Sequence, residues 1–395
     1  MRLLRVPRTT SYDLVLVVVI LALTLLGIAM VYSASGIKAL DALDEPRYFL
    51  GWQSLWAALG LVGMLAATRI DYHRYRMLAL PLLVGALALL AAVLVPGLGT
   101  TVNGAARWLR AGPVGLQPAE LAKLALILYL AFWLGARRDR IERGGTVIGF
   151  VVSTGLVGAL VFAEPDLGTA IVIGAIALAM YFVAGARLWM FAALAMLSTV
   201  LAFAGALAHP ERVERLMTFI DPWKDPRDAG YQAIQALYGL ALGGLSGEGL
   251  GAGREKFGFL PFPYTDSIFP IIGEELGFVG CALIVVLFLF LAFRGFRLAR
   301  RTQDLYGALL ATGITTWLIL QALINIGANT ATIPYTGVPL PFISFGGSSI
   351  VVSLAAVGIL LNISRYIQEP EMPALVHYTM NFRKNGLRKT KIVCE

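Results

Sequence analysis

Three carboxylates lie close together in residues 256–278, KFGFLPFPYTDSIFPIIGEELGF, at the start of a long apolar segment: Asp266, Glu274 and Glu275. Ionised groups are costly near hydrocarbon, so they are retained there mainly for a chemical task or for a fixed partner. Asp266 precedes the apolar run and could serve as a general base, its pKa set by partial burial and nearby cations. Two simpler interpretations are an N-cap of the following helix and an ion pair with Lys256 or Arg254.

Further ionisable residues lie within apolar segments. Glu274 and Glu275 follow Asp266 by about two helical turns. We expect a structural role for both in a polar interior, paired with a cation or with backbone groups. Glu120 and Lys123 are three residues apart and therefore share a helix face. They form either an ion pair that locks helices together or a substrate site, in which Lys123 holds an anionic group and Glu120 tunes it.

Four arginines provide candidate phosphate contacts. Arg107 and Arg110 flank a tryptophan in NGAARWLRAG, and Arg212 and Arg215 have helical spacing in HPERVERLMTF. The planar guanidinium group suits bidentate binding of a phosphate. Simpler interpretations are anchoring at the membrane interface for the first pair, and ion pairs with neighbouring glutamates for the second.

The composition indicates an integral membrane protein. The 395 residues are 58% hydrophobic and only 14% charged, with a mean hydropathy of +0.76, whereas a soluble domain is about 25% charged. The net charge of +8 does not indicate nucleic-acid binding, because the basic residues fall in short loops between apolar runs. The sequence also lacks the P-loop, HExxH and CxxC motifs of ATP-driven pumps, zinc enzymes and redox proteins.

Ten apolar runs are suited to cross a bilayer as helices, which takes about 20 residues. They are residues 13–33, 49–68, 78–95, 117–135, 146–163, 167–185, 188–208, 268–293, 307–328 and 348–364. Lys and Arg are more frequent on the side of the N-terminus, which predicts that both termini are cytoplasmic. We therefore expect an all-α integral membrane protein, with a ten-helix domain (13–366) between a cytoplasmic N-terminus (1–12) and a basic cytoplasmic tail (367–395).

Two loops on the predicted outer side favour a cavity there. The loop 209–267, between the seventh and eighth spans, is much longer than connecting loops usually are. It contains an amphipathic stretch at 228–245, expected to lie on or dip into the outer leaflet, and the glycine-rich turn GEGLGAG. The uncharged, proline-rich loop 331–347 could fold back toward the bilayer, where irregular backbone is tolerated only if it is buried or lines a cavity.

Six ordered blocks of sequence resemble the SEDS family of shape, elongation, division and sporulation proteins, typified by RodA and FtsW. The blocks are MVYSAS, NGAARWLRAGPVGLQPAELAKLAL, EPDLGTAIVI, RLMTFIDPWKDPRDAGYQAIQAL, GLGAGREKFGFLPFPYTDSIFPIIGEELGFVG and TGVPLPFISFGGSS. GYQAIQAL and GLGAGREKFGFLP favour an FtsW-like over a RodA-like member. The family has ten transmembrane helices, in agreement with the count above.

The resemblance implies a peptidoglycan glycosyltransferase that polymerises lipid II at the outer face of the bacterial cytoplasmic membrane. It implies a class B penicillin-binding protein as partner, together with other divisome or elongasome membrane proteins. The family's essential aspartate corresponds to Asp266, its upstream lysine to Lys256, its QPxExxK pair to Glu120 and Lys123, and its NGxxRW arginine to Arg107. The chain departs from the family pattern around the aspartate, where Phe262, Tyr264 and Ser267 replace an acid, a histidine and a phenylalanine.

In the implied reaction, Asp266 deprotonates the acceptor's 4-hydroxyl, which attacks C1 of a polyprenyl-linked glycan and displaces undecaprenyl pyrophosphate. Cations must stabilise the anionic leaving group, and the candidates are Arg107, Lys123, Arg212, Arg215 and Lys256. A divalent cation, Mg²⁺ or Mn²⁺, would add to this stabilisation, although the sequence shows no ligand cluster and no metal ligand is assigned.

Two other functions are compatible with an apolar, multi-span chain. A lipid II flippase would use the intramembrane charges for gating, but it needs polar groups accessible from both faces. Here the polar residues and the long loops concentrate on the outer side. A scaffold that only recruits a cross-linking partner would leave the charged cavity unexplained.

Overall fold

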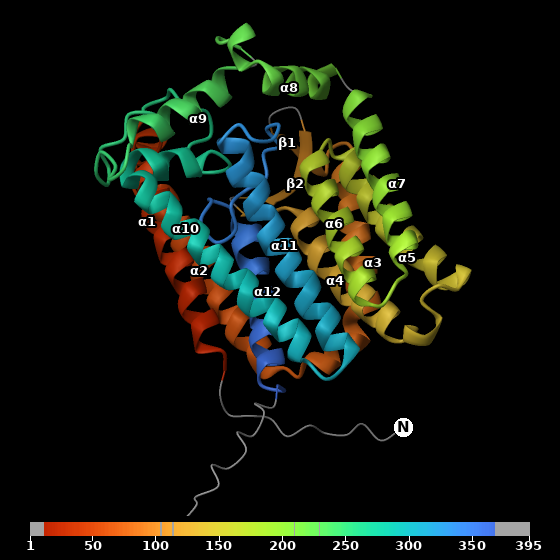
Figure 1. The fold of residues 1–395 in the computed structure, drawn as a ribbon. Coiled ribbons are helices and arrows are strands. Elements are labelled where there is room, and N and C mark those ends of the chain that lie inside the picture. Colours follow the sequence, from red (N-terminus) through yellow and green to blue (C-terminus); the bar gives the residue numbers. More distant parts are fainter. Residues whose placement is uncertain (1–11, 103–104, 113, 209, 229, 368–395) are drawn as a thin grey trace, which may run out of the picture.

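The computed structural model describes residues 12–102, 105–112, 114–208, 210–228 and 230–367. Nearly all of the predicted N-terminal segment (1–12) and tail (367–395) therefore lies outside the described residues. The described part is a bundle of long helices with two short helices and a small sheet gathered at one end (Figure 1). We call this the loop end.

Each of the ten predicted spans coincides with one long helix. These helices are α1 (Leu14–Leu43), α2 (Tyr48–Arg69), α3 (Tyr75–Leu94), α4 (Pro118–Gly135), α5 (Gly144–Ala163), α6 (Leu167–Val183), α7 (Leu188–Leu207), α10 (Ile268–Arg301), α11 (Leu305–Asn329) and α12 (Gly347–Ser364). Nine of the helices in the described part are long and apolar enough to cross a membrane, and α6 is a shorter apolar helix of 17 residues. The predicted multi-pass fold is confirmed.

The centre of the bundle is formed by α4, α11 and α12, whose residues are mostly buried, whereas α7 lies at the edge and buries only Ala206 (Figure 1). Close packing in the centre depends on small residues. A Cβ on Gly358 of α12 would lie 2.4 Å from the backbone oxygen of Met64 in α2. Small residues at helix interfaces allow such approaches in membrane proteins.

A three-stranded antiparallel sheet between α3 and α4 is an addition to the all-α prediction. Strand β1 (Gly99–Val102) pairs with β2 (Ala105–Ala111), and β2 pairs with β3 (Val114–Leu116). The strands are short, and the sequence indicates interfacial anchoring or phosphate contact for Arg107 and Arg110 rather than a sheet. The sheet instead fixes these side chains on a hydrogen-bonded platform over the bundle.

The loop 209–267 contains α8 (Pro210–Ile220) and α9 (Tyr231–Leu242), so a helix forms within the predicted amphipathic stretch 228–245. Helix α9 buries Ile234, Ala236 and Gly239 and packs against α10. Part of its apolar surface is therefore covered by protein, while Tyr238 and Leu242 remain exposed. That this stretch lies on or dips into the outer leaflet stays a prediction.

Gly243 at the end of α9 offers a test of this packing. It has ordinary right-handed backbone angles, but a Cβ there would lie 1.8 Å from the backbone oxygen of Gly273 in α10. We expect Gly243→Ala to lower the unfolding free energy by about 1–3 kcal/mol because the two helices must move apart. Gly155→Ala on α5, where a Cβ meets nothing within 4 Å, is the control. Equal thermal unfolding midpoints for the two variants in detergent would contradict this packing.

Candidate active site

A cavity of about 890 Å³ occupies the loop end of the bundle. Both loops that were predicted to form a cavity line it. Loop 209–267 contributes Arg215, Gln232 and Asp266, and loop 331–347 contributes Tyr335 and Gly347. The remaining walls come from α2, the sheet and the start of α6. The predicted cavity is thus present, built from segments that are far apart in the sequence.

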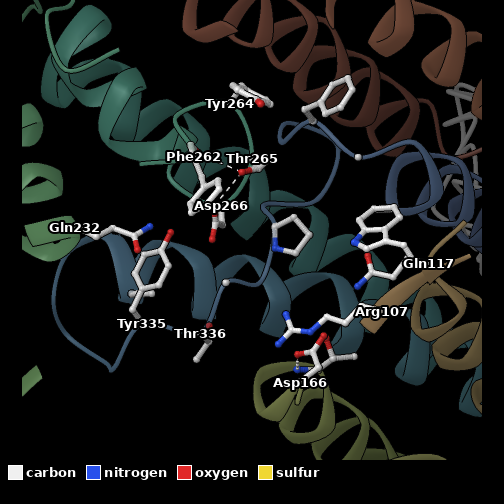
Figure 2. Close-up of a pocket in the computed structure, with 18 of the residues that line it drawn as sticks. Arg107, Gln117, Asp166, Gln232, Phe262, Tyr264, Thr265, Asp266, Tyr335 and Thr336 are labelled. Carbon is white, nitrogen blue, oxygen red and sulfur yellow. Dashed lines mark hydrogen bonds between the residues drawn. The ribbon is translucent and has the colours of Figure 1, made fainter. Parts of the chain in front are cut away.

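Asp266 lies in the cavity wall and is half-buried (Figure 2). Its backbone oxygen accepts hydrogen bonds from the side-chain amides of Asn325 and Asn329, each at 2.8 Å. Its carboxylate accepts from the Thr265 hydroxyl at 2.9 Å. The N-cap interpretation is wrong, because α10 is capped by Ser267 and has no side-chain cap hydrogen bond.

A chain of hydrogen bonds supports the Asp266 carboxylate. The Gln232 amide donates to the Ser267 hydroxyl at 3.1 Å, which lies 2.8 Å from the Tyr335 hydroxyl. Tyr335 in turn donates to Asp266. Figure 2 shows Gln232, Tyr335 and Asp266 facing the same space. Ser267, which replaces the family's phenylalanine, is therefore part of the support for the carboxylate.

The environment of Asp266 suits a proton acceptor. Burial raises the pKa of Asp266, while the hydroxyls of Thr265 and Tyr335 and the charge of Arg215 act in the opposite direction. The pKa of Tyr335 is itself raised well above its ordinary value by burial and by the nearby Asp266. A partly buried carboxylate with a raised pKa is a stronger base than one in water.

Three arginines reach the same cavity: Arg107, Arg110 and Arg215. Arg107 is held in place because its Nε donates to the backbone oxygen of Glu164 at 3.0 Å and its terminal nitrogen to that of Pro165. The turn that provides these oxygens is fixed by Asp166, which caps α6 through Thr169. The cavity thus combines a proton acceptor with cations suited to an anionic group.

Comparison with known proteins identifies the chain. A family model described as "Cell cycle protein", covering FtsW, RodA and SpoVE, matches residues 13–369. The chain belongs to this family. A probable peptidoglycan glycosyltransferase FtsW of Geobacter metallireducens is 41% identical over 91% of this chain and 96% of that protein. Stage V sporulation protein E of Bacillus subtilis is 42% identical over 91% and 98%.

Solved structures give the same assignment. One, reported under "Structural coordination of polymerization and crosslinking by a peptidoglycan synthase complex", has a TM-score of 0.75 and 31% identity over 90% of this chain and 98% of that chain. The rod shape determining protein RodA of Thermus thermophilus has a TM-score of 0.68 and 30% identity over 91% and 99%. The family resemblance is confirmed. The chain is 41% identical to the FtsW of Geobacter metallireducens and 30% identical to the RodA of Thermus thermophilus, which agrees with an FtsW-like member.

Not all of the family's matching residues reach the cavity. Lys123 is buried, and its ammonium donates to Glu120 at 2.8 Å and to Gln321 at 2.7 Å, beside the Trp317 ring. Gln321 also donates to the backbone oxygen of Pro339 in the cavity loop, at 3.1 Å. The structure therefore favours the ion-pair interpretation, with Lys123 and Glu120 supporting the cavity wall from behind.

Arg212 and Lys256 also point elsewhere. Arg212 donates to the backbone oxygen of Gly205 at 2.9 Å and lies over the Phe162 ring. Lys256 forms a buried ion pair with Glu275 at 2.6 Å and donates to Ser33 of α1 at 3.0 Å. The interpretation of Asp266 as an ion-pair partner of Lys256 or Arg254 is therefore wrong, since Arg254 lies nearest Glu248.

Glu274 and Glu275 are buried and hydrogen-bonded to the segment that precedes Asp266. Glu274 accepts hydrogen bonds from the backbone amides of Arg254, at 2.6 Å, and Glu255. Glu275 accepts from the Gly251 amide at 3.0 Å in addition to the Lys256 ammonium. Together these bonds fasten the glycine-rich segment 247–256, which we call the Gly-rich strap, to α10.

Sequence analysis gave no role to Glu164, although it lies in the family block EPDLGTAIVI. Both of its carboxyl oxygens are buried and have no hydrogen-bond partner among the described residues. Burial and the neighbouring Asp166 raise the pKa of Glu164 to about 8, and Arg107 acts against this. The raised pKa favours the neutral form of this buried carboxyl, which lies beside the turn that holds Arg107.

The described residues do not by themselves form a metal centre. No group of three or more His, Cys, Asp or Glu side chains in the described ranges could hold an ion. The side chains that contact the Asp266 carboxylate are the hydroxyls of Thr265 and Tyr335, not further acids.

The strap provides a stability test. Lys256→Met leaves Glu275 buried without its cation, which costs about 3–5 kcal/mol for a buried pair. Arg254→Met is the matched control, because Arg254 is exposed and its nearest contact with Glu248 is 3.9 Å. We expect a markedly lower thermal unfolding midpoint in detergent for Lys256→Met only. If both variants unfold like the parent chain, the strap is not held by this ion pair.

Proposed function

We propose that this chain polymerises lipid II into glycan strands, with Asp266 as the general base. Relatives at about 40% identity are named peptidoglycan glycosyltransferases, which confirms the enzyme class predicted from the motifs. The observation that carries the assignment of the base is the half-buried Asp266 carboxylate, of raised pKa, in one cavity with three arginines.

The chemistry requires one proton transfer and one substitution. Asp266 accepts the proton from the 4-hydroxyl of the acceptor GlcNAc as that oxygen attacks C1 of the donor MurNAc. The bond from C1 to the pyrophosphate oxygen breaks with inversion, and undecaprenyl pyrophosphate leaves with the electron pair. Arg107, Arg110 and Arg215 stabilise the charge that develops on this leaving group.

A divalent cation, Mg²⁺ or Mn²⁺, would add positive charge at the pyrophosphate when bound. The described residues provide no ligand set of their own for it, so we assign it no step. Substrate oxygens would have to supply most of its ligands.

We place the protein in the bacterial cytoplasmic membrane, with both termini in the cytoplasm and the loop end outside. This orientation follows the distribution of Lys and Arg along the sequence. A class B penicillin-binding protein is the proposed partner, supported by the similarity to a peptidoglycan synthase complex. Other divisome or elongasome membrane proteins are further expected partners.

The geometry favours a polymerase over a flippase. The cavity is lined by segments of the loop end, and the buried charges Lys123 and Lys256 are already paired with carboxylates. A transporter needs a polar path between both faces and charges that are free to change partners.

Asp266→Asn tests the base directly. The amide keeps the size of the side chain but cannot accept the proton, so we expect polymerisation of purified lipid II to fall by about 10²–10⁴-fold. Asp225→Asn, at an exposed carboxylate that does not line the cavity, is the control and should retain activity. The readout is glycan-chain length on gels, and undiminished polymerisation by Asp266→Asn would exclude it as the base.

Tyr335→Phe tests how the basicity is set. Because the Tyr335 hydroxyl lowers the pKa of Asp266, its removal should raise that pKa and favour the protonated, inactive carboxyl. The acidic limb of the kcat/KM profile for lipid II should therefore move to higher pH. Tyr238→Phe, an exposed tyrosine on α9 outside the cavity, should leave the limb unchanged. An acidic limb at the same pH in both variants would remove Tyr335 from the support of the base.

A further inference from the structure

We propose that the stacked indoles of Trp52 and Trp56 on α2 form a saccharide subsite that binds pyranose rings of the glycan. The inference rests on the proposed function and names the part of the cavity that holds sugar rather than pyrophosphate. We call this pair the indole platform.

The geometry of the platform is that of a preformed surface. Trp52 and Trp56 are one helical turn apart, with ring centroids separated by 6.0 Å and planes inclined by 26°. Both line the cavity and both are half-buried. Tyr48 lies one turn before Trp52, with ring centroids 6.4 Å apart, but its plane is inclined by 61° and does not continue the stack. Residues 48 to 56 span about 12 Å along the helix axis, a length comparable to a disaccharide.

The platform is held against the protein. A Cβ on Gly347 would lie 2.6 Å from the Trp56 indole, so the start of α12 touches this ring. The neighbouring Phe49 contacts Tyr264 and Phe345, with ring centroids 4.6 and 5.2 Å away. Tyr264, which replaces a family histidine, thereby extends the aromatic wall to within two residues of Asp266. Fixed rings of this kind lose little entropy on binding a ligand.

Anchoring in the membrane explains these rings less well. Aromatic residues that anchor a helix face the lipid headgroups. The exposed large hydrophobic side chains of α2 are all aliphatic: Val62 at 64%, Leu65 at 55%, and Leu55 and Leu59 at 47% each. The two indoles instead share the cavity with Gln117, Arg107 and Arg110.

The mixed wall selects the ligand class. A pyranose presents an apolar C–H face, which packs on an aromatic ring, and a rim of hydroxyls, which hydrogen-bond with neighbouring polar groups. A polyprenyl chain would cover the indoles but offer no hydrogen-bond partner to Gln117 and Arg110 beside them, which is costly when water is excluded. Pyrophosphate suits the arginines but gains nothing from aromatic faces.

The test separates the saccharide from the pyrophosphate. The probe is a soluble (GlcNAc–MurNAc)₂ tetrasaccharide that carries neither lipid nor pyrophosphate, added to the full chain in detergent. Saturation-transfer NMR should show magnetisation reaching its ring C–H protons in the parent chain. We expect the signal to fall about ten-fold in Trp52→Leu and Trp56→Leu, and to remain in Trp52→Phe, which keeps an aromatic face.

Two controls define specificity. Trp189→Leu removes an indole of α7 that is 65% exposed and lies outside the cavity, and should bind the probe like the parent chain. Arg215→Gln should weaken binding of inorganic pyrophosphate by calorimetry while leaving the tetrasaccharide signal intact. Trp52→Leu should weaken the tetrasaccharide signal and leave binding of inorganic pyrophosphate unchanged.

The proposal is overturned if the parent chain gives no signal with the tetrasaccharide, or if folded Trp52→Leu and Trp56→Leu bind it unchanged. In polymerisation assays, the platform variants should raise KM for lipid II about ten-fold with little change in kcat. A parent chain that binds the tetrasaccharide but does not polymerise lipid II would contradict the proposed function and leave the subsite standing. Polymerisation with an unchanged KM in the platform variants would contradict the subsite and leave the proposed function standing.

Discussion

The buried ion pair between Lys256 and Glu275 is the contact on which the arrangement of the loop end depends. It joins the Gly-rich strap to α10 and, through Ser33, to α1. A buried pair is stable only if the remaining donors and acceptors are also satisfied. Here the Gly251 amide and the Ser33 hydroxyl complete the coordination of Glu275. The strap ends ten residues before Asp266. The Lys256–Glu275 pair therefore helps to position the segment that carries Asp266.

The charges of the chain fall into two groups with different consequences. Lys123 and Lys256 are buried and paired, and each fastens a segment that lines the cavity or leads to it. Arg107, Arg110 and Arg215 lie in the cavity wall and remain accessible to an anion. The two groups differ in burial. A buried charge must be compensated by a partner within the protein, whereas a charge in the cavity wall can be hydrated until a ligand binds.

The sequence predicted the helices well because bilayer thickness leaves little choice of length for an apolar run. The two cavity loops could also be located, from their length and from their proline and glycine content. The small sheet was missed, although an Asn-Gly dipeptide between its first two strands is a hairpin signal. Its strands have 3 to 7 residues, too few for a clear alternation of apolar and polar positions.

Partners of individual side chains were harder to predict. Asp266, Lys256 and Glu275 lie within 20 residues, and nothing in their spacing shows that Lys256 turns to Glu275 rather than to Asp266. The supports of Asp266 come from residues 232, 325, 329 and 335, and only folding brings them together. Family resemblance located the aspartate but gave no role to Tyr335 or to Gln232, although Gln232 lies in the GYQAIQAL block.

The tether of Asp266 has a consequence for repeated turnover. Asn325 and Asn329 hold the backbone oxygen of this residue, whereas the side chains that hydrogen-bond to the carboxylate are the hydroxyls of Thr265 and Tyr335. The hydrogen bonds from these two side-chain amides to the backbone oxygen can form whether the Asp266 side chain is charged or neutral. In the proposed reaction, the aspartate would therefore gain a proton from one acceptor and release it before the next without loosening its anchor.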